Sequence, residues 1–381
     1  MEKVFGAIWR YIKQTDMMLI LITLVAALYG LLLVYSAMKS TGGSRTVLTQ
    51  LIAIILGLVS MVILSKIDYA DMIHLWKFVA AVGVILLLLP FVLPHTRAGS
   101  QDLSWVNLKF ITIQPAEFVK VFFVITFAKH YETVKENIKS PLNVLLLTLH
   151  AGVPIGIIVV QKDMGMALVF ICMFVSMMFA ANVQLRYFAL GSIALLASSP
   201  LIWLKIFSNT QRNRILMLFD PIKYADSTAL QQLSARKAIG SGELWGYGIF
   251  NGPRTQSTAS SMLPERQNDM IFAVAGEELG FIGCILILII FIVLLLLIIS
   301  KVRSSKDSLG AMICVGIFSS FAVQMVINIG MVLMLLPVIG ISLPLFSSGG
   351  SSVLSSFFAV GVVLSVHMHR KKPLFAGQWK E

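Results

Sequence analysis

Long apolar runs separated by short polar segments make up most of this 381-residue chain. A helix needs about 20 predominantly apolar residues to cross a bilayer, and about ten runs approach that length. They predict spans near residues 17–38, 46–65, 72–94, 116–130, 141–160, 164–181, 187–207, 270–300, 309–336 and 353–368. The pattern therefore predicts an all-α integral membrane protein, with one polytopic membrane domain over residues 1–381.

Residues 208–269 form the one long polar segment of the chain. Its many glycines and prolines, including those at Asp220-Pro221 and Gly252-Pro253, indicate tight turns. Trp245 and Phe250 are available to dip into the membrane surface. We therefore expect a large extracytoplasmic loop that contains short amphipathic helices.

The distribution of positive charge predicts the orientation. Short loops on one side of the predicted spans, with both termini, carry sixteen Lys and Arg residues, whereas the opposite short loops carry five. Because cytoplasmic loops are enriched in Lys and Arg, both termini are predicted to lie in the cytoplasm and residues 208–269 outside. The net charge of +12 is spread over short loops rather than gathered on one face, so we expect no nucleic-acid partner.

The strongest candidate chemistry lies where the polar segment meets the next apolar run. Four carboxylates surround this point: Glu265, Asp269, Glu277 and Glu278. The preference of helix N-termini for acidic residues explains some of them, but hardly all four. Asp269, at the expected helix start, is typical of a general base or a metal ligand. Glu277 and Glu278, two turns deeper, are expected to stabilise helices.

A second candidate is the pair Glu117 and Lys120 at the start of the fourth span. Their spacing places opposite charges on one helical face at or in the membrane. One interpretation is a structural ion pair that fixes helix packing. The other is that they line a water-filled cavity that receives an anionic head group.

Two turns between predicted spans, one charged and one uncharged, give weaker signals of a binding site. Asp163 lies in a turn between the fifth and sixth spans, where a solvated loop and helix cap is the favoured interpretation. Ser351 belongs to a segment rich in Gly and Ser before the last span. Such a segment can offer amides and hydroxyls to a phosphate or sugar, although on its own a close-packed re-entrant turn is favoured.

Several motifs in this order resemble the SEDS family (shape, elongation, division and sporulation), which contains the RodA and FtsW polymerases of bacterial peptidoglycan. The motifs are Tyr35-Ser36-Ala37, Trp105-Val106-Asn107-Leu108, Gln114-Pro115-Ala116-Glu117, Ala238–Gly242, Leu263–Gly283, Leu336–Gly340 and Ser348–Ser352. The chain is divergent, because Asn268-Asp269-Met270 stands where the family usually has Thr-Asp-Phe. The Trp105 motif and Arg254-Thr255-Gln256-Ser257 look more like RodA than FtsW.

The resemblance implies a glycosyltransferase that polymerises lipid II on the outer face of the bacterial cytoplasmic membrane. It also implies a class B penicillin-binding protein as partner, with other elongation or division machinery. The family's essential aspartate maps onto Asp269, its membrane-embedded Glu and Lys onto Glu117 and Lys120, and its outer-loop tryptophan onto Trp105.

The expected reaction requires a base for the acceptor sugar's 4-hydroxyl and positive charge for the leaving diphosphate. Asp269 is the candidate base; as an alternative it binds a divalent cation, Mg²⁺ or Mn²⁺, and no organic cofactor is expected. Lys120 is the first candidate for the diphosphate, ahead of cations in the polar segment. The substrate-binding candidates are Glu117, Lys120, Trp105, Arg254, Glu265, Arg266, Asp163 and Ser351.

A membrane transporter, such as a lipid II flippase, is the rival hypothesis. In it Glu117, Lys120 and Asp269 form a translocation pathway. A carrier needs its determinants near the membrane midplane. The clustering of motifs on the predicted outer side favours the enzyme.

Overall fold

Helices dominate the computed structural model, which describes Gly6, Trp9 and residues 11–93, 103–107, 112–225, 229–259 and 262–370. The long helices are α2 (Met17–Lys39), α3 (Ser44–Lys66), α5 (Trp76–Val92), α6 (Pro115–Val134), α7 (Pro141–Val160), α8 (Met164–Ala180), α9 (Leu185–Leu201), α12 (Ile271–Ser304), α13 (Ser308–Val332) and α14 (Gly350–Met368). The short elements are α4 (Tyr69–His74), η1 (Lys135–Asn137), the π-helix η2 (Ile202–Ile206), α10 (Asn209–Leu216), α11 (Leu230–Ser241) and the strands β1 (Val106–Asn107) and β2 (Thr112–Ile113).

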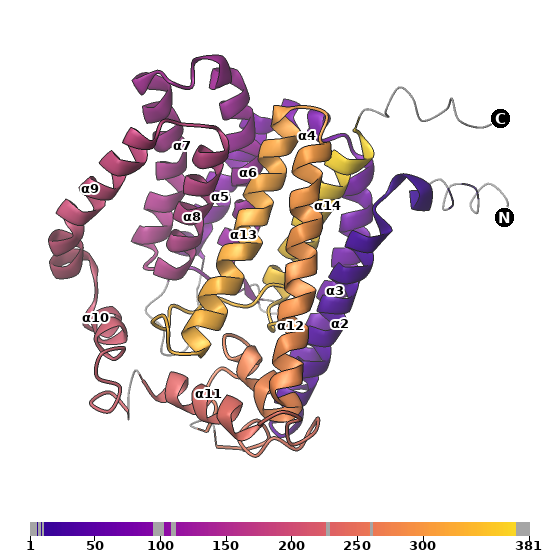
Figure 1. Cartoon of the computed structure of the whole chain (residues 1–381), viewed down its shortest axis with the longest axis vertical. Coiled ribbons are helices and arrows are strands. Elements are labelled where there is room, and N and C mark those ends of the chain that lie inside the picture. Colours follow the sequence, from indigo (N-terminus) through magenta and orange to yellow (C-terminus); the bar gives the residue numbers. More distant parts are fainter. Residues whose placement is uncertain are drawn as a thin grey trace.

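The all-α membrane architecture predicted from the apolar runs is confirmed. Each predicted span contains one long helix within the described ranges, and the helices form a bundle (Figure 1). In this part of the chain, seven helices have the length and apolar composition of a membrane span, and α5 and α8 are shorter apolar helices. Helix α6 also has 20 residues but carries four charged side chains. The chain is therefore a multi-pass membrane protein.

Three predicted boundaries differ from the structure. The span predicted at 72–94 is divided at Leu75 between α4 and α5, and residue 94 lies outside the described residues. The span predicted at 187–207 ends as the π-helix η2. The span predicted at 309–336 ends at Val332, because Met334 adopts a φ of 61° and the N–H groups of Leu335 and Leu336 turn back to the carbonyl of Gly330.

The first and last long helices meet at the end of the bundle opposite α11. The Thr15 hydroxyl donates to the Met368 sulfur at 3.3 Å, and Asp16 forms an ion pair with Lys301 at the end of α12. Burial tends to raise the pKa of the Asp16 carboxyl, but Lys301 and the Leu19 N–H together hold that pKa below its usual value. The start of α2 and the end of α14 therefore lie on the same side of the membrane.

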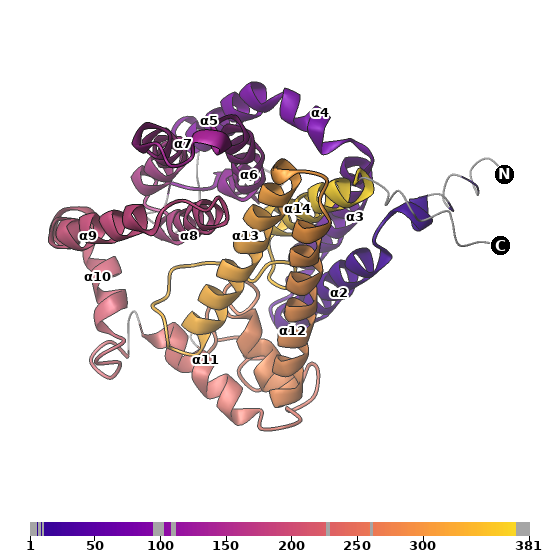
Figure 2. The same ribbon diagram turned by 45° about the horizontal axis from the view of Figure 1, so that its top comes forward.

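Helix α14 lies inside the bundle and packs closely on α3 (Figure 2). Glycines allow this approach: a Cβ on Gly57 would lie 2.5 Å from the Phe357 ring, and one on Gly361 would lie 3.0 Å from the Cα of Met61. Small residues at helix contacts are the usual means of close packing within a membrane. The start of α14 is thereby held beside the start of α3.

The segment between α13 and α14, residues 333–349, folds back into the bundle. Leu345 and Phe346 are fully buried, and the Phe346 ring stacks on Phe291 with centroids 5.4 Å apart. Gly30 of α2 lies against the backbone of this segment, since a Cβ there would be 2.5 Å from the Leu345 carbonyl oxygen and the Phe346 Cα. The segment is therefore fixed by direct contact with α2 and α12.

The polar segment predicted as a loop contains α10 and α11, as expected, and its second half is joined to a kink in α12. Gly280 has φ 66° and ψ −159°, which interrupts the helix. The carbonyls of Glu277 and Glu278 accept from the N–H groups of Tyr247 and Gly248 instead of continuing the helix. Because exposed backbone groups are costly in a membrane, this exchange stabilises both segments.

Gly280→Ala is expected to lower the free energy of unfolding by at least about 2 kcal/mol, because this backbone conformation is almost confined to glycine. The added Cβ would also lie 2.5 Å from the Gly246 nitrogen. The matched control is Gly156→Ala on α7, where a Cβ meets nothing within 4 Å. A helical Gly→Ala change there should be neutral or stabilise by up to about 1 kcal/mol. Thermal unfolding in detergent measures both, and equal melting temperatures would contradict the role of the kink.

Candidate functional site

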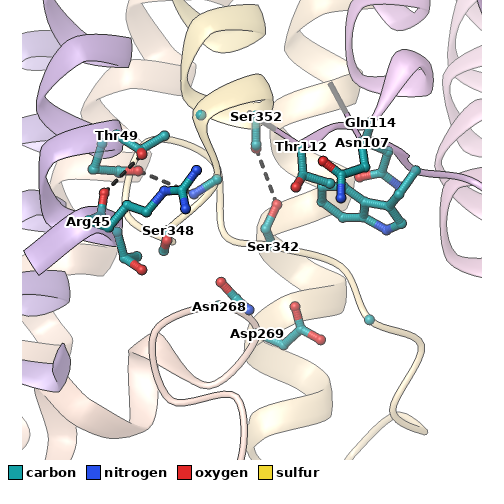
Figure 3. A pocket seen from close by; sticks show the side chains of 16 residues that line it. Arg45, Thr49, Asn107, Thr112, Gln114, Asn268, Asp269, Ser342, Ser348 and Ser352 are labelled. Carbon is teal, nitrogen blue, oxygen red and sulfur yellow. Dashed lines mark hydrogen bonds between the residues drawn. The ribbon is translucent and has the colours of Figure 1, made fainter. Parts of the chain in front are cut away.

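A polar cavity of about 440 Å³ opens at the end of the bundle that α11 covers. It lies among the start of α3, the β1–β2 pair, the end of the polar segment and the start of α14 (Figure 3). Its lining residues are Arg45, Thr46, Thr49, Gln50, Trp105, Asn107, Thr112, Gln114, Asn268, Asp269, Gly340, Ser342, Ser348, Gly349, Gly350 and Ser352. We call this the first cavity. Hydroxyl and amide groups dominate its lining, as a sugar or phosphate ligand requires.

Asp269 presents its carboxylate to the first cavity while only 8% of the residue is exposed. Its backbone is fixed by Asn328, whose side-chain amide donates to the carbonyls of Asp269 at 2.9 Å and Ile341 at 2.8 Å. Opposite the carboxylate, Gly340 has φ 71°, and a Cβ there would lie 3.7 Å from Asp269 Oδ2. The carboxylate therefore faces the backbone of a glycine, and no side chain at position 340 limits its access.

The segment before Asp269 is anchored to the re-entrant segment 333–349. The Ser347 hydroxyl donates to the Asn268 carbonyl at 2.7 Å, and the Ser348 N–H donates to the Gln267 carbonyl at 2.7 Å. Two irregular segments therefore satisfy each other's backbone groups, as buried backbone must. In the Gly- and Ser-rich segment 343–352, the chain turns at residues 344–346 and enters α14 at Gly350, and residues 348–350 and Ser352 line the cavity.

The opposite side of the cavity comes from α3, and sequence reasoning missed it. Arg45, Thr46, Thr49 and Gln50 lie in the first two turns of α3. Arg45 is the one Lys or Arg among the described lining residues, and it enters from a different side than Asp269 (Figure 3). The available signal was a polar stripe at the start of an otherwise apolar helix.

Trp105 shares the first cavity with Asp269. It precedes β1, which pairs antiparallel with β2 so that Val106 lies opposite Ile113. The pair leads directly into Gln114, the residue before α6, whose side chain also lines the cavity. The structure therefore brings the predicted tryptophan and aspartate to one site.

Glu117 and Lys120 lie deeper than the cavity and do not line it. Lys120 Nζ is 2.7 Å from Glu117 Oε2 and donates to Gln324 Oε1 at 2.7 Å. The Ser355 hydroxyl donates to Glu117 at 3.2 Å, and both charged residues are buried. The space beside them is only about 10 Å³. The pair ties α6 to α13 and α14, which is the arrangement of a structural ion pair; its substrate-binding role stays a prediction.

Glu277 and Glu278 hold part of the polar segment rather than lining the cavity. Glu277 accepts from the Arg254 N–H at 3.0 Å, and from the N–H and hydroxyl of Thr255, each at 2.7 Å. Glu278 accepts from the side chains of Ser36 and Gln256. These donors satisfy the hydrogen-bonding capacity of both buried carboxylates. The two carboxylates hold the loop at residues 254–256, and the expected stabilisation of a helix stays a prediction.

Arg254 is half-buried, whereas Arg266 is buried. Arg266 is buried and donates to the carbonyls of Thr255 at 2.6 Å and Ser257 at 2.7 Å. Burial lowers the pKa of the Arg266 guanidinium, and Glu277 acts in the opposite direction. The Arg254 backbone is bound by Glu277. Neither arginine lines the first cavity, so their predicted contacts with substrate stay predictions.

The remaining predicted residues lie at the margins of the cavity. Asp163 caps α8 through the Met166 N–H and accepts from Gln114 Nε2 at 2.8 Å. The Ser351 hydroxyl accepts from the Gln114 N–H at 3.3 Å. Glu265 is exposed and accepts from Asn268 Nδ2 at 2.6 Å. All three support residues that line the cavity, and none lines it directly.

Comparison with known proteins identifies the family. The sequence model of the cell cycle proteins FtsW, RodA and SpoVE matches residues 16–372. The chain belongs to this family. The resemblance seen in the sequence motifs is therefore confirmed, and the match extends over nearly all of the membrane helices.

Individual relatives are similar along almost their full length. The stage V sporulation protein E of Bacillus subtilis (strain 168) is 33% identical, over 93% of this chain and 98% of the relative. A probable peptidoglycan glycosyltransferase FtsW from the same strain is 30% identical, over 95% and 93%. A chain from the structure of a peptidoglycan synthase complex that coordinates polymerization and crosslinking has a TM-score of 0.76 at 24% identity, over 93% and 97%. These similarities do not separate the subfamilies, and the RodA assignment stays a prediction.

Lys120→Met is expected to lower the free energy of unfolding by about 3–5 kcal/mol, because it leaves the Glu117 carboxylate buried without its cation. The double variant Glu117→Gln/Lys120→Met should recover most of that stability. Lys129→Met removes a pair of the same spacing, with side chains 31% and 28% exposed, and should cost at most about 1 kcal/mol. Thermal unfolding in detergent compares the three. A double variant no more stable than Lys120→Met would contradict the structural role.

Proposed function

We propose that this protein is a peptidoglycan glycosyltransferase that joins lipid II units into glycan strands on the outer face of the cytoplasmic membrane. The observation that carries the proposal is the Asp269 carboxylate, fixed in a polar cavity that also contains Arg45. Relatives named peptidoglycan glycosyltransferase FtsW support the substrate class. Family membership, cavity chemistry and location at a membrane end all agree.

The first cavity supplies the two groups that the reaction needs. Asp269 accepts the proton of the acceptor sugar's 4-hydroxyl. The oxygen of that hydroxyl then forms a bond with the donor's anomeric carbon, while the bond from that carbon to the lipid diphosphate breaks. The diphosphate leaves with the electron pair, and the Arg45 guanidinium stabilises its negative charge. Trp105 and the amide side chains orient the sugars.

The cavity is also compatible with a divalent cation bound together with substrate. Mg²⁺ is usually held by one or two carboxylates, several waters and substrate phosphates. Asp269 is the sole carboxylate among the described residues that line the cavity, and no cluster of three or more His, Cys, Asp or Glu occurs in the described part of the chain. A Mg²⁺ or Mn²⁺ ion would therefore be held by Asp269 and the diphosphate, and it would neutralise phosphate charge.

Orientation and partners complete the proposal. The excess of Lys and Arg in one set of loops supports an orientation with both termini in the cytoplasm and the first cavity outside. A class B penicillin-binding protein would cross-link the product, together with other elongation or division machinery. The similarity of fold to a chain from a peptidoglycan synthase complex supports such a partnership. The RodA-like motifs favour a role in cell elongation.

The rival transporter hypothesis fits the structure less well. A carrier needs a site near the midplane with access from both faces. In the described residues, the deeper pair Glu117 and Lys120 is buried beside a space of only about 10 Å³. The large polar cavity opens at one end of the bundle, as a surface enzyme requires.

Asp269→Asn is expected to reduce the polymerisation rate by at least about 100-fold, because the amide cannot accept the hydroxyl proton. The measurement is glycan synthesis from purified lipid II in nanodiscs, with a cognate class B penicillin-binding protein and with Mg²⁺ or Mn²⁺. Glu243→Gln is the matched control, since it removes an exposed carboxylate of the same polar segment outside the cavity. Its activity should equal wild type.

Two outcomes would contradict the proposal in different ways. Full polymerisation by Asp269→Asn would remove Asp269 from the chemistry. Absence of polymer from wild type, with movement of lipid II across vesicles containing the protein, would favour the transporter. Equal melting temperatures of wild type and Asp269→Asn show that lost activity is not lost folding.

A further inference from the structure

A second cavity, of about 280 Å³, lies beside the first at the same end of the bundle. It is lined by the turn between α7 and α8, by α10 with the two residues before it, and by residues 337–339 of segment 333–349. Its lining residues are Lys162, Asp163, Met164, Gly165, Phe207, Ser208, Thr210, Gln211, Arg214, Ile215, Pro337, Val338 and Ile339. The proposed reaction of the first cavity does not use these residues.

The two cavities share a wall. Pro337, Val338 and Ile339 line the second cavity, while Gly340 and Ser342 of the same extended segment line the first. A hydrogen bond of 2.8 Å also crosses between them, from Gln114 in the first cavity to Asp163 in the second. A group bound in the second cavity is therefore separated from Asp269 by a single extended segment of backbone, residues 337–342.

The charge of the second cavity favours an anion. Lys162 and Arg214 line it, and neither forms an ion pair with any residue that the structure describes. The one carboxylate, Asp163, already accepts from the Met166 N–H and from Gln114. Hydroxyls of Ser208 and Thr210 add donors. Two cations with hydroxyl donors are the usual means of binding a phosphate or diphosphate.

An apolar groove of about 640 Å³ lies deeper, between α9 and the two helices, α7 and α8, whose connecting turn lines the second cavity. Its near end, at Ile155 and Ile171, lies about two helical turns, or about 10 Å, from Lys162 and Gly165 of the second cavity, and the groove extends from there to Pro141 and Tyr187 near the starts of α7 and α9. Helix α9 stands at the edge of the bundle in both views, and none of its residues is buried (Figures 1 and 2). This loose contact leaves room for a hydrocarbon chain inside the span of the membrane.

We propose that the second cavity and this groove together bind a second lipid diphosphate, with its phosphates at Lys162 and Arg214 and its long isoprenoid chain between α7, α8 and α9. The inference rests on the proposed function, because joining two lipid-linked units requires two diphosphates near one base. Arg45 serves the unit in the first cavity, and Lys162 with Arg214 serves the other. The shared wall at 337–342 keeps the two head groups apart while both sugars reach Asp269.

Binding of undecaprenyl diphosphate to the protein in phosphatidylcholine nanodiscs tests this inference without catalysis. Wild type is expected to bind two equivalents. Lys162→Gln/Arg214→Gln should keep one site and bind the second equivalent at least about tenfold more weakly, since charge-assisted contacts are lost. Lys205→Gln/Lys223→Gln removes the same charge from exposed positions outside the cavity and should bind like wild type.

The groove is tested by filling it. Gly152 and Gly191 line the groove, and a Cβ on either meets nothing within 4 Å. Gly152→Phe/Gly191→Phe should therefore fold, weaken the second equivalent of undecaprenyl diphosphate, and leave binding of the short-chain geranyl diphosphate unchanged. Unchanged binding of the long chain would overturn the assignment of the groove.

Other outcomes are equally distinct. One equivalent bound by wild type, or two retained by Lys162→Gln/Arg214→Gln, would overturn the second site. Equal competition by phosphatidylglycerol would show a general anionic-lipid surface and overturn its assignment to a diphosphate. If wild type binds two equivalents but makes no glycan from lipid II, the polymerase proposal fails while the binding site stands.

Discussion

Backbone groups that leave a helix near the membrane must find partners within the protein, and this constraint governs the cavity end of the molecule. Three irregular segments meet there, and buried polar side chains hold them together. Glu277 binds the N–H groups at 254–255, Arg266 binds the carbonyls at 255 and 257, and Asn328 joins the carbonyls of Asp269 and Ile341. The Asp269 backbone is fixed because every neighbouring segment is fixed.

The charged residues at this end of the molecule differ in whether they line the first cavity. Glu117, Lys120 and Arg266 are buried and occupied by partners in the protein. Asp269 presents its carboxylate to a cavity large enough for part of a substrate. Burying a charge without a partner is costly, so the contacts of Glu117, Lys120 and Arg266 stabilise the fold, and their predicted contacts with substrate stay predictions. Asp269 and Arg45 line the first cavity, where a ligand can reach them.

Sequence patterns predicted the helices well, because a membrane span is a local property of about 20 residues. They failed where an end depends on tertiary contacts, as at Val332, after which the chain turns back into the bundle. The sequence identified Asp269 as a candidate because this residue ends the one long polar segment of the chain. Arg45 was not identified, because at the sequence level it differs little from the charges that set orientation, and its place in the cavity depends on α3 packing beside α14.

Gly30, in the middle of α2, lies against Leu345 and Phe346 and contacts neither cavity. Any side chain at this position would displace the re-entrant segment that carries Ser347 and Ser348, and those residues hold the backbone leading to Asp269. The position of the backbone that lines the first cavity therefore depends on a residue in the middle of a membrane-spanning helix. A larger residue at position 30 would therefore shift the backbone that leads to Asp269, although position 30 lines neither cavity.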